Sequence, residues 1–102
     1  MEQLNRIELR GIVGSVYVKD FGNEKVTNFN VATNYAYKME DGTPVIETTW
    51  HRIIAWNCTE SISKGDTVHV LGRLRASHYV DDTGNGQTFY EVFANSVKVI
   101  DR

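Results

Sequence analysis

The chain has 102 residues, 41% of them apolar and 24% charged, so it has the size of one domain, 1–102, and is too hydrophobic for wholesale disorder. Its formal net charge of −2 argues against a basic surface over the whole molecule, although it allows a local basic face. One cysteine, Cys58, excludes an internal disulfide, and no apolar run approaches the ~20 residues that span a bilayer, so we expect a cytoplasmic protein with no membrane partner.

Alternating apolar and polar residues, interrupted by Gly, Asp and Asn, predict five β-strands. The expected strands span residues 4–18, 26–37, 45–56, 67–78 and 87–100. Gly11 and Gly14 lie inside the first run, which predicts a bulge or a sharp bend there. Asp41-Gly42 predicts a hairpin turn between the second and third runs. The pattern is that of an all-β chain with tight turns.

One short helix is expected at residues 58–63, between the third and fourth strands. Asn57 is a suitable N-cap, Glu60 completes a capping-box-like pair, and Gly65 is suited to the C-terminal end. The order is then three strands, a short helix and two more strands. This order is typical of a five-stranded OB-fold Greek-key barrel, which has its helix between strands 3 and 4.

The third run carries the most informative residues. Trp50, Arg52 and Trp56 have one parity and share a face, while Ile53 and Ala55 share the opposite face. An arginine among core residues is costly unless it is paired, so we expect the tryptophan face to be exposed. Two indoles with a guanidinium between them suit a single-stranded nucleic acid, whose bases stack on aromatic rings while arginine meets phosphate.

The fourth run adds further cations. Arg73 and Arg75 alternate with Leu74, so we expect both arginines to point outward and Leu74 to enter the core. Tyr79 extends this run just before a loop. Tyr37, with Tyr35, ends the second run beside another loop, where a tyrosine can either clamp a base or pack against the sheet.

Catalytic patterns are absent from the sequence. His51, His69 and His78 have no cysteine or carboxylate at metal-ligand spacing. The sequence contains no nucleophile elbow, Walker loop or dinucleotide fingerprint. We therefore expect a binding protein without enzymatic activity, metal ion or cofactor.

The blocks at residues 49–56, 64–68 and 72–75 resemble the bacterial single-stranded DNA-binding proteins, and the resemblance runs from Leu4 to Ile100. It implies an OB fold and a homo-oligomer, usually a tetramer. It also implies that the DNA-contacting aromatic residues of the family correspond to Trp50, Trp56, Tyr37 and Tyr79.

Three features depart from the family pattern. The segment between Trp56 and Lys64 is short, which truncates the helix. Glu8 and Arg10 place charges in a strand that the family uses for subunit contacts, so dimer and tetramer both stay open. The chain ends at Arg102 without the acidic tail that recruits repair enzymes, so recruitment is not predicted.

We expect sequence-independent binding and protection of single-stranded DNA in replication, recombination and repair, with no small-molecule substrate. The expected nucleic-acid-binding residues are the stacking aromatics and the phosphate-binding arginines: Trp50, Trp56, Tyr37, Tyr79, Arg52, Arg73 and Arg75. The alternative is an OB-fold interaction module of a replication-restart or plasmid-transfer complex that binds nucleic acid weakly. The acidic balance, the short helix and the missing tail motivate this alternative.

Overall fold

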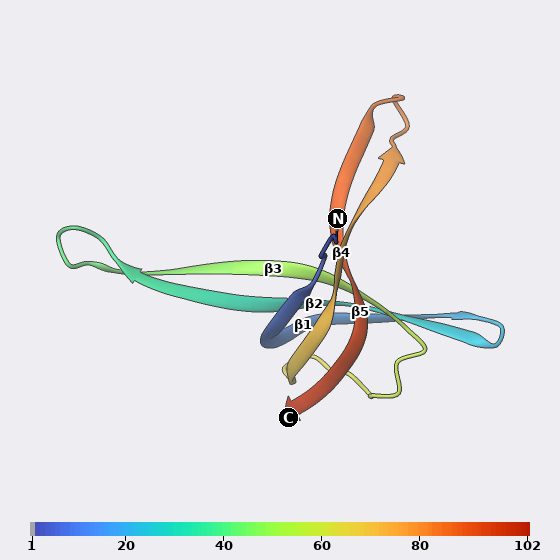
Figure 1. Ribbon diagram of the computed structural model, residues 1–102, viewed down its shortest axis with the longest axis horizontal. Helices are drawn as coiled ribbons and strands as arrows, with labels where there is room; N and C mark the ends of the chain where they lie inside the picture. The colour runs from blue at the N-terminus through green and yellow to red at the C-terminus, as the bar shows by residue number, and fades with distance from the viewer. Residues whose placement is uncertain (1) are drawn as a thin grey trace.

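The computed structural model describes residues 2–102 and contains five strands in that range, with no helix (Figure 1). The strands are β1 (Ile7–Phe21), β2 (Glu24–Lys38), β3 (Pro44–Trp56), β4 (Thr67–Val80) and β5 (Gly86–Asp101). All five predicted strands are confirmed, with bounds that differ from the predicted ones by at most three residues. Within residues 2–102 there is no helix of the length and hydrophobicity that a membrane crossing needs.

The strands pair around a closed ring in the order β1-β2-β3-β5-β4. Antiparallel pairing joins every neighbouring pair of strands except β3 and β5, which meet in a short parallel contact. β1 serves two partners: residues 7–12 pair with β4, and residues 12–21 pair with β2. A bulge between Val13 and Val16 follows this change of partner, as the glycines in the first run predicted.

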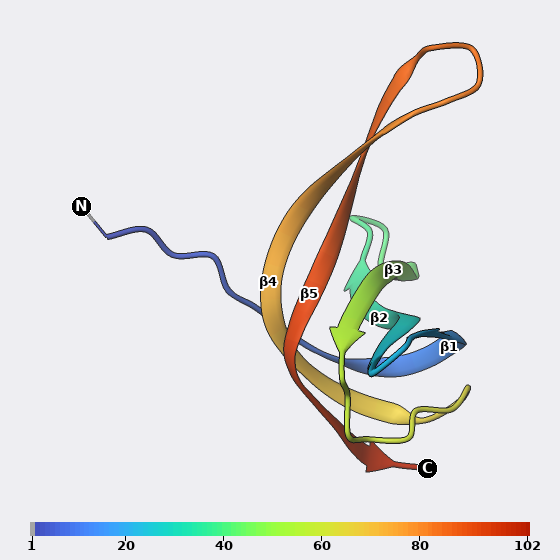
Figure 2. The same ribbon diagram turned by 90° about the vertical axis from the view of Figure 1, so that its right-hand side faces the viewer.

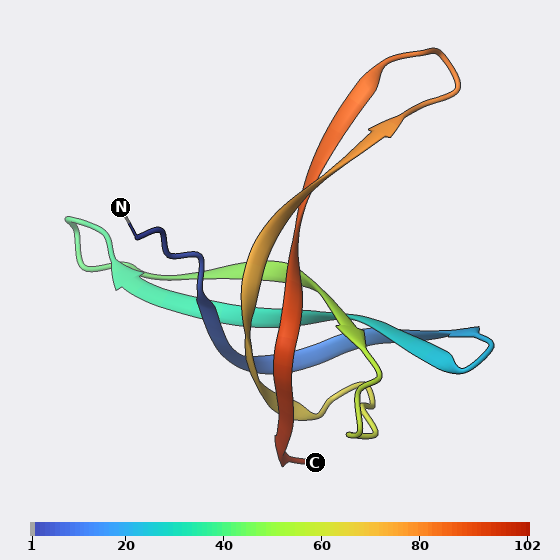
Figure 3. The same ribbon diagram turned by 45° about the vertical axis from the view of Figure 1, so that its right-hand side comes forward.

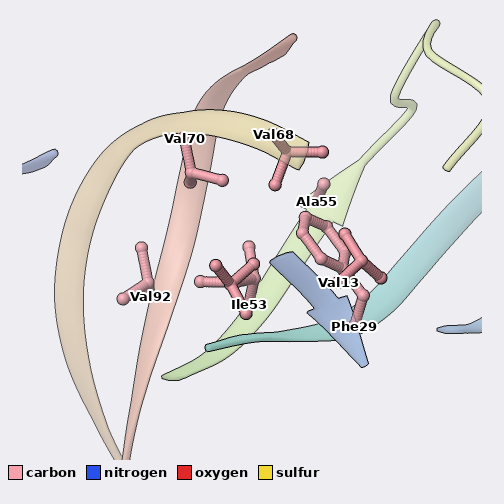
Figure 4. Close-up of a cluster of buried hydrophobic side chains, with 8 residues drawn as sticks. Val13, Phe29, Ile53, Ala55, Val68, Val70 and Val92 are labelled. Carbon is pink, nitrogen blue, oxygen red and sulfur yellow. The ribbon is translucent and has the colours of Figure 1, made fainter. Parts of the chain in front are cut away.

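The core lies inside the ring and contains residues from every strand (Figure 4). Each strand turns alternate side chains inward, so small β-branched residues fill most of the interior. The buried apolar cluster consists of Val13, Phe29, Val31, Ile53, Ala55, Val68, Val70 and Val92. Ile53 and Ala55 face inward as predicted, which leaves the opposite side of β3 toward solvent.

Three hairpins extend beyond the ring in different directions. The β2–β3 and β1–β2 hairpins extend to opposite sides, and the β4–β5 hairpin rises between them (Figures 1 and 3). The segment before β1 leaves the ring on its own path, far from the C-terminus (Figure 2). The outer parts of these hairpins have no core to cover, so aromatic side chains there are exposed.

The predicted helix at 58–63 is wrong, because the segment forms turns and irregular backbone. Asn57 adopts a left-handed conformation with φ 52°, and its side-chain oxygen accepts a hydrogen bond from the Lys25 N–H at 3.0 Å. The Asn57 side chain therefore bonds to the backbone of β2 and does not cap a following helical turn. Cys58 and Ile62 pack against the core. A helix of one or two turns gains too few hydrogen bonds to compete with these contacts.

The prediction that Leu74 enters the core is also wrong, since Leu74 is 39% exposed. Leu74 has the inward parity of Val68 and Val70, but it lies where β4 has passed beyond the ring. Its backbone is held by Asn5, whose amide accepts from the Leu74 N–H at 2.8 Å and donates to its carbonyl at 2.7 Å. The segment before β1 thus covers Leu74 only in part.

Candidate nucleic-acid interface

The outward face of β3 presents two tryptophans and an arginine to solvent. Trp50 is 57% exposed and Trp56 is 49% exposed, and the Arg52 side chain is 55% exposed. The prediction that this face is exposed is confirmed. The backbone alternation that buries Ile53 and Ala55 is what turns these three side chains outward.

Strand pairing brings the arginines of β4 onto the same face. Ile54 lies beside Phe93 in the parallel contact of β3 with β5, and Phe93 lies opposite Arg73 in β4. The guanidiniums of Arg73 and Arg75 lie 5.3 and 4.7 Å from the centre of the Phe93 ring. An aromatic ring beneath a guanidinium restrains its plane and leaves its N–H groups free for an anion.

Phe89 and Phe93 are residues of this face that the sequence analysis missed. Phe89 supports two predicted residues: the Arg52 guanidinium lies 5.4 Å from its ring centre, and the Tyr79 ring meets it edge-on at 5.5 Å. The alternation of Phe89 and Phe93 around Glu91 in the fifth run was the available signal. Their role depends on strand order, which the sequence does not show.

A buried carboxylate lies under the arginine of β3. Glu91 is 4% exposed, accepts a hydrogen bond from the Ser77 hydroxyl at 2.6 Å, and lies 3.9 Å from an Arg52 guanidinium nitrogen. The charge of Arg52 is therefore partly compensated within the protein. Neither Arg73 nor Arg75 has a carboxylate within salt-bridge distance in the part of the chain that the structure describes.

A groove on this face brings together residues of all five strands. It is lined by Ser15, Tyr17, Asn28, Phe29, Asn30, Trp50, His51, Arg52, Tyr79 and Glu91. Of the predicted residues, Trp50, Arg52 and Tyr79 line this groove, and Arg73 and Arg75 stand beside it on β4. The groove thus combines π surfaces, amide groups and a cation, which suit stacked bases and a phosphate backbone.

The position of the Trp50 indole depends on a glycine of β1. A Cβ atom on Gly14 would lie 2.5 Å from Cζ3 of Trp50 and 2.6 Å from the side-chain oxygen of Asn30. The same Asn30 oxygen accepts a hydrogen bond from the Ser15 N–H at 2.7 Å. Since the indole lies directly over the backbone of Gly14, any larger residue there would displace it.

Of the predicted residues, Trp56 and Tyr37 do not line the groove. Trp56 ends β3 on the face of Trp50 and Arg52, whereas Tyr37 does not share that face. It lies on the β2–β3 hairpin, is 40% exposed, and donates a hydrogen bond from its hydroxyl to Glu47 at 3.2 Å. In the β2–β3 register, Trp50 pairs with Ala32, so Tyr37 has the opposite parity. It therefore belongs to the other side of the hairpin ribbon, next to Tyr35 at 6.0 Å between ring centres.

His51 also lines the groove, although it has the inward parity of Ile53 on β3. Burial lowers the pKa of its imidazole, which favours the neutral form. Its Nε2 lies 2.8 Å from the Thr33 hydroxyl. Among residues 2–102 no three His, Cys, Asp or Glu side chains gather in a way that could hold a metal ion.

Comparison with known proteins places the chain among DNA-binding relatives. The Single-strand binding protein family model matches residues 4–100. The chain is 29% identical to "Single-stranded DNA-binding protein 1" of Chlorobaculum tepidum, with 95% of the chain and 65% of that protein covered. It is 32% identical to the single-stranded DNA-binding protein of Neisseria meningitidis, over 95% of the chain and 60% of that protein.

A solved structure described as a Plasmodium falciparum SSB complex with ssDNA is similar with a TM-score of 0.85 and 26% identity, covering 100% of this chain and 97% of that one. The chain spans 60–65% of the length of the two curated relatives above. The family model, in contrast, covers nearly all of the chain. The chain belongs to the single-strand binding protein family.

Proposed function

We propose that this protein binds and protects single-stranded DNA without sequence preference and without catalysis, in replication, recombination and repair. The observation that carries the proposal is the groove in which Trp50, Arg52 and Tyr79 lie together on one face. Bases of any sequence stack on such rings, at about 1–3 kcal/mol each. Arg73 and Arg75, held over Phe93, supply the positive charge beside it.

The proposal assigns two roles. The aromatic residues Trp50, Trp56 and Tyr79 stack bases, and the arginines contact phosphates. Tyr37 is included as a more distant stacking residue that DNA reaches only after it leaves the groove. Family membership supports DNA binding itself, because the relatives carry single-stranded DNA binding in their names.

We take the five-stranded ring to be an OB-fold Greek-key barrel that forms one domain, 1–102, and works as a homo-oligomer, either a tetramer or a dimer. A reducing cytoplasm is the setting that best fits Cys58, the single free cysteine. The similarity in fold to the ssDNA complex supports the first of these points.

The test is a titration of the protein with oligo-dT at low and moderate salt, followed by tryptophan fluorescence. We expect strong quenching and an affinity that falls with salt, because phosphate binding releases counterions. Trp50→Ala should weaken binding roughly 5- to 150-fold, the equivalent of about 1–3 kcal/mol. Tyr90→Ala is a matched control, since Tyr90 is 66% exposed and lies on the opposite face of β5 from Glu91.

Equal losses in the Trp50 and Tyr90 variants would contradict the site assignment. If the folded protein shows no quenching at either salt concentration, the indoles do not meet bases. The alternative of an interaction module with weak DNA binding would then be preferred, and a pull-down would be the next experiment.

A further inference from the structure

A second row of exposed side chains lies on β1, beyond its bulge. Val16 pairs with the buried Phe29 and so points inward. The residues at odd positions after Val16 therefore point outward. These are Tyr17, Lys19 and Phe21, and the two aromatic residues are 60% and 56% exposed. The Lys19 ammonium lies 5.7 Å from the centre of the Tyr17 ring.

This row continues the groove described above. Tyr17 itself lines the groove with Trp50 and Arg52. At the other end of the row, Phe21 stacks on Trp56 with 6.0 Å between ring centres and 26° between ring planes. The row thus connects the two tryptophans of β3 along the β1–β2 hairpin, which extends away from the ring (Figure 1).

The balance of charge along the row favours stacking over phosphate binding. Glu24 lies directly opposite Phe21 in the register, so it offsets the charge of Lys19 on the same side of the hairpin. An exposed aromatic pair with little net charge suits the faces of bases better than a polyanionic backbone.

We propose that Tyr17, Lys19 and Phe21 form, together with Trp56, a second segment of the single-stranded DNA path. Bases that leave the groove past Tyr17 stack next on the Phe21–Trp56 pair, and Lys19 stays over the Tyr17 ring between them. This inference rests on the proposed function. It extends the site onto the β1–β2 hairpin, where the sequence analysis placed no binding residue.

The experiment compares Phe21→Ala with the wild-type chain on fluorescently labelled oligo-dT of increasing length, by anisotropy. Short oligonucleotides fill only the groove, so both proteins should bind them alike. On longer oligonucleotides Phe21→Ala should bind roughly 5- to 150-fold more weakly, the range for one lost stacking partner. Phe21→Tyr should retain binding because it keeps the ring.

Val18→Ala is the matched control. Val18 lies on the same hairpin and is 50% exposed, but it has the opposite parity to Tyr17 and Lys19. This variant should bind every length like the wild type, and thermal melting should show that all variants are folded.

Two results would overturn the inference. In one, Phe21→Ala binds every length like the wild type, so that its ring touches no base. In the other, Phe21→Ala weakens short and long oligonucleotides equally, so that the ring acts only by supporting the groove. A wild-type protein that binds no length refutes the proposed function itself, which is a different outcome from either.

Discussion

Gly14→Ala tests whether a backbone position of β1 sets the stacking surface of β3. The new Cβ would lie 2.5 Å from Cζ3 and 2.9 Å from Cη2 of Trp50, whereas carbon atoms in contact are about 3.5–4.0 Å apart. The indole must therefore move by about 1 Å. Because Trp50 is 57% exposed, moving its ring outward is less costly than moving the backbone.

The expected effect is on binding more than on folding. A displaced indole loses up to the full stacking contribution of about 1–3 kcal/mol, which is roughly a 5- to 150-fold rise in Kd. Overpacking costs about 1–3 kcal/mol of stability, and this is partly offset by about 0.4–1 kcal/mol because alanine restricts the unfolded chain. Gly14 has no positive φ, so alanine fits its backbone conformation.

The assay uses a Trp56→Phe background, in which Trp50 is the single tryptophan of the chain, since the sequence contains two. Oligo-dT titrations then report the contact of Trp50 with bases, and urea denaturation reports stability. The reasoning is refuted if Gly14→Ala leaves both the Trp50 emission and the Kd unchanged. It is also refuted if Gly14→Ala weakens binding as much in a Trp50→Ala background, because the glycine then does not act through the indole.

Four further substitutions probe charge, packing and protonation. Arg75→Gln should lower the slope of log K for DNA binding against log salt by about 0.7. Arg52→Gln should lower this slope less, because Glu91 lies 3.9 Å from Arg52 and already offsets its charge. A larger change for Arg52→Gln than for Arg75→Gln in salt titrations would contradict this. Ile53→Ala should cost about 2–5 kcal/mol in the free energy of unfolding, measured in urea, because Ile53 is 0% exposed. Burial lowers the pKa of His51 below 6.5, so the free energy of unfolding should keep its full value above pH 6.5 and fall as the pH drops below it. His51→Gln should make the fall in Tm between pH 7.5 and 5 smaller. An equal fall in both proteins would exclude His51 as its source.

The strands could be predicted because their residues carry a local signal. In β3 the alternation of Trp50 and Arg52 with Ile53 and Ala55 reflects one buried and one exposed side, so both the strand and its exposed face follow from the sequence. The helix prediction failed because an asparagine side chain can either cap a helix or bond to a distant backbone group. Asn57 is a good N-cap, but here it bonds to the backbone of Lys25, a residue 32 positions away, and no local pattern shows such a partner.

The unpredicted part of the site depends on a bulge and on strand order. Read with one unbroken alternation, Tyr17 has the parity of the buried Val13, so the sequence gives no reason to place it outside. The bulge between Val13 and Val16 reverses the parity and turns Tyr17 and Phe21 outward. Phe89 joins the site because β5 lies beside β3 as well as β4, and the β3–β5 contact joins residues far apart in the chain.

The net charge of −2 does not describe the field at the proposed interface, because several acidic residues, Glu40, Asp41, Asp81 and Asp82, lie in hairpin loops. Asp41 accepts hydrogen bonds from the side chain and the N–H of Thr43, and Asp81 accepts them from the Thr83 hydroxyl and the Asn85 N–H. Hydrogen bonds of this kind lower the pKa of both carboxyls and stabilise their charge at the hairpin tips. Among the residues that line the groove or stand beside it on β4, the charges are three arginines against one buried carboxylate, Glu91, which already has two partners. A polyanion approaching that face therefore meets a local excess of positive charge on a protein that is acidic as a whole.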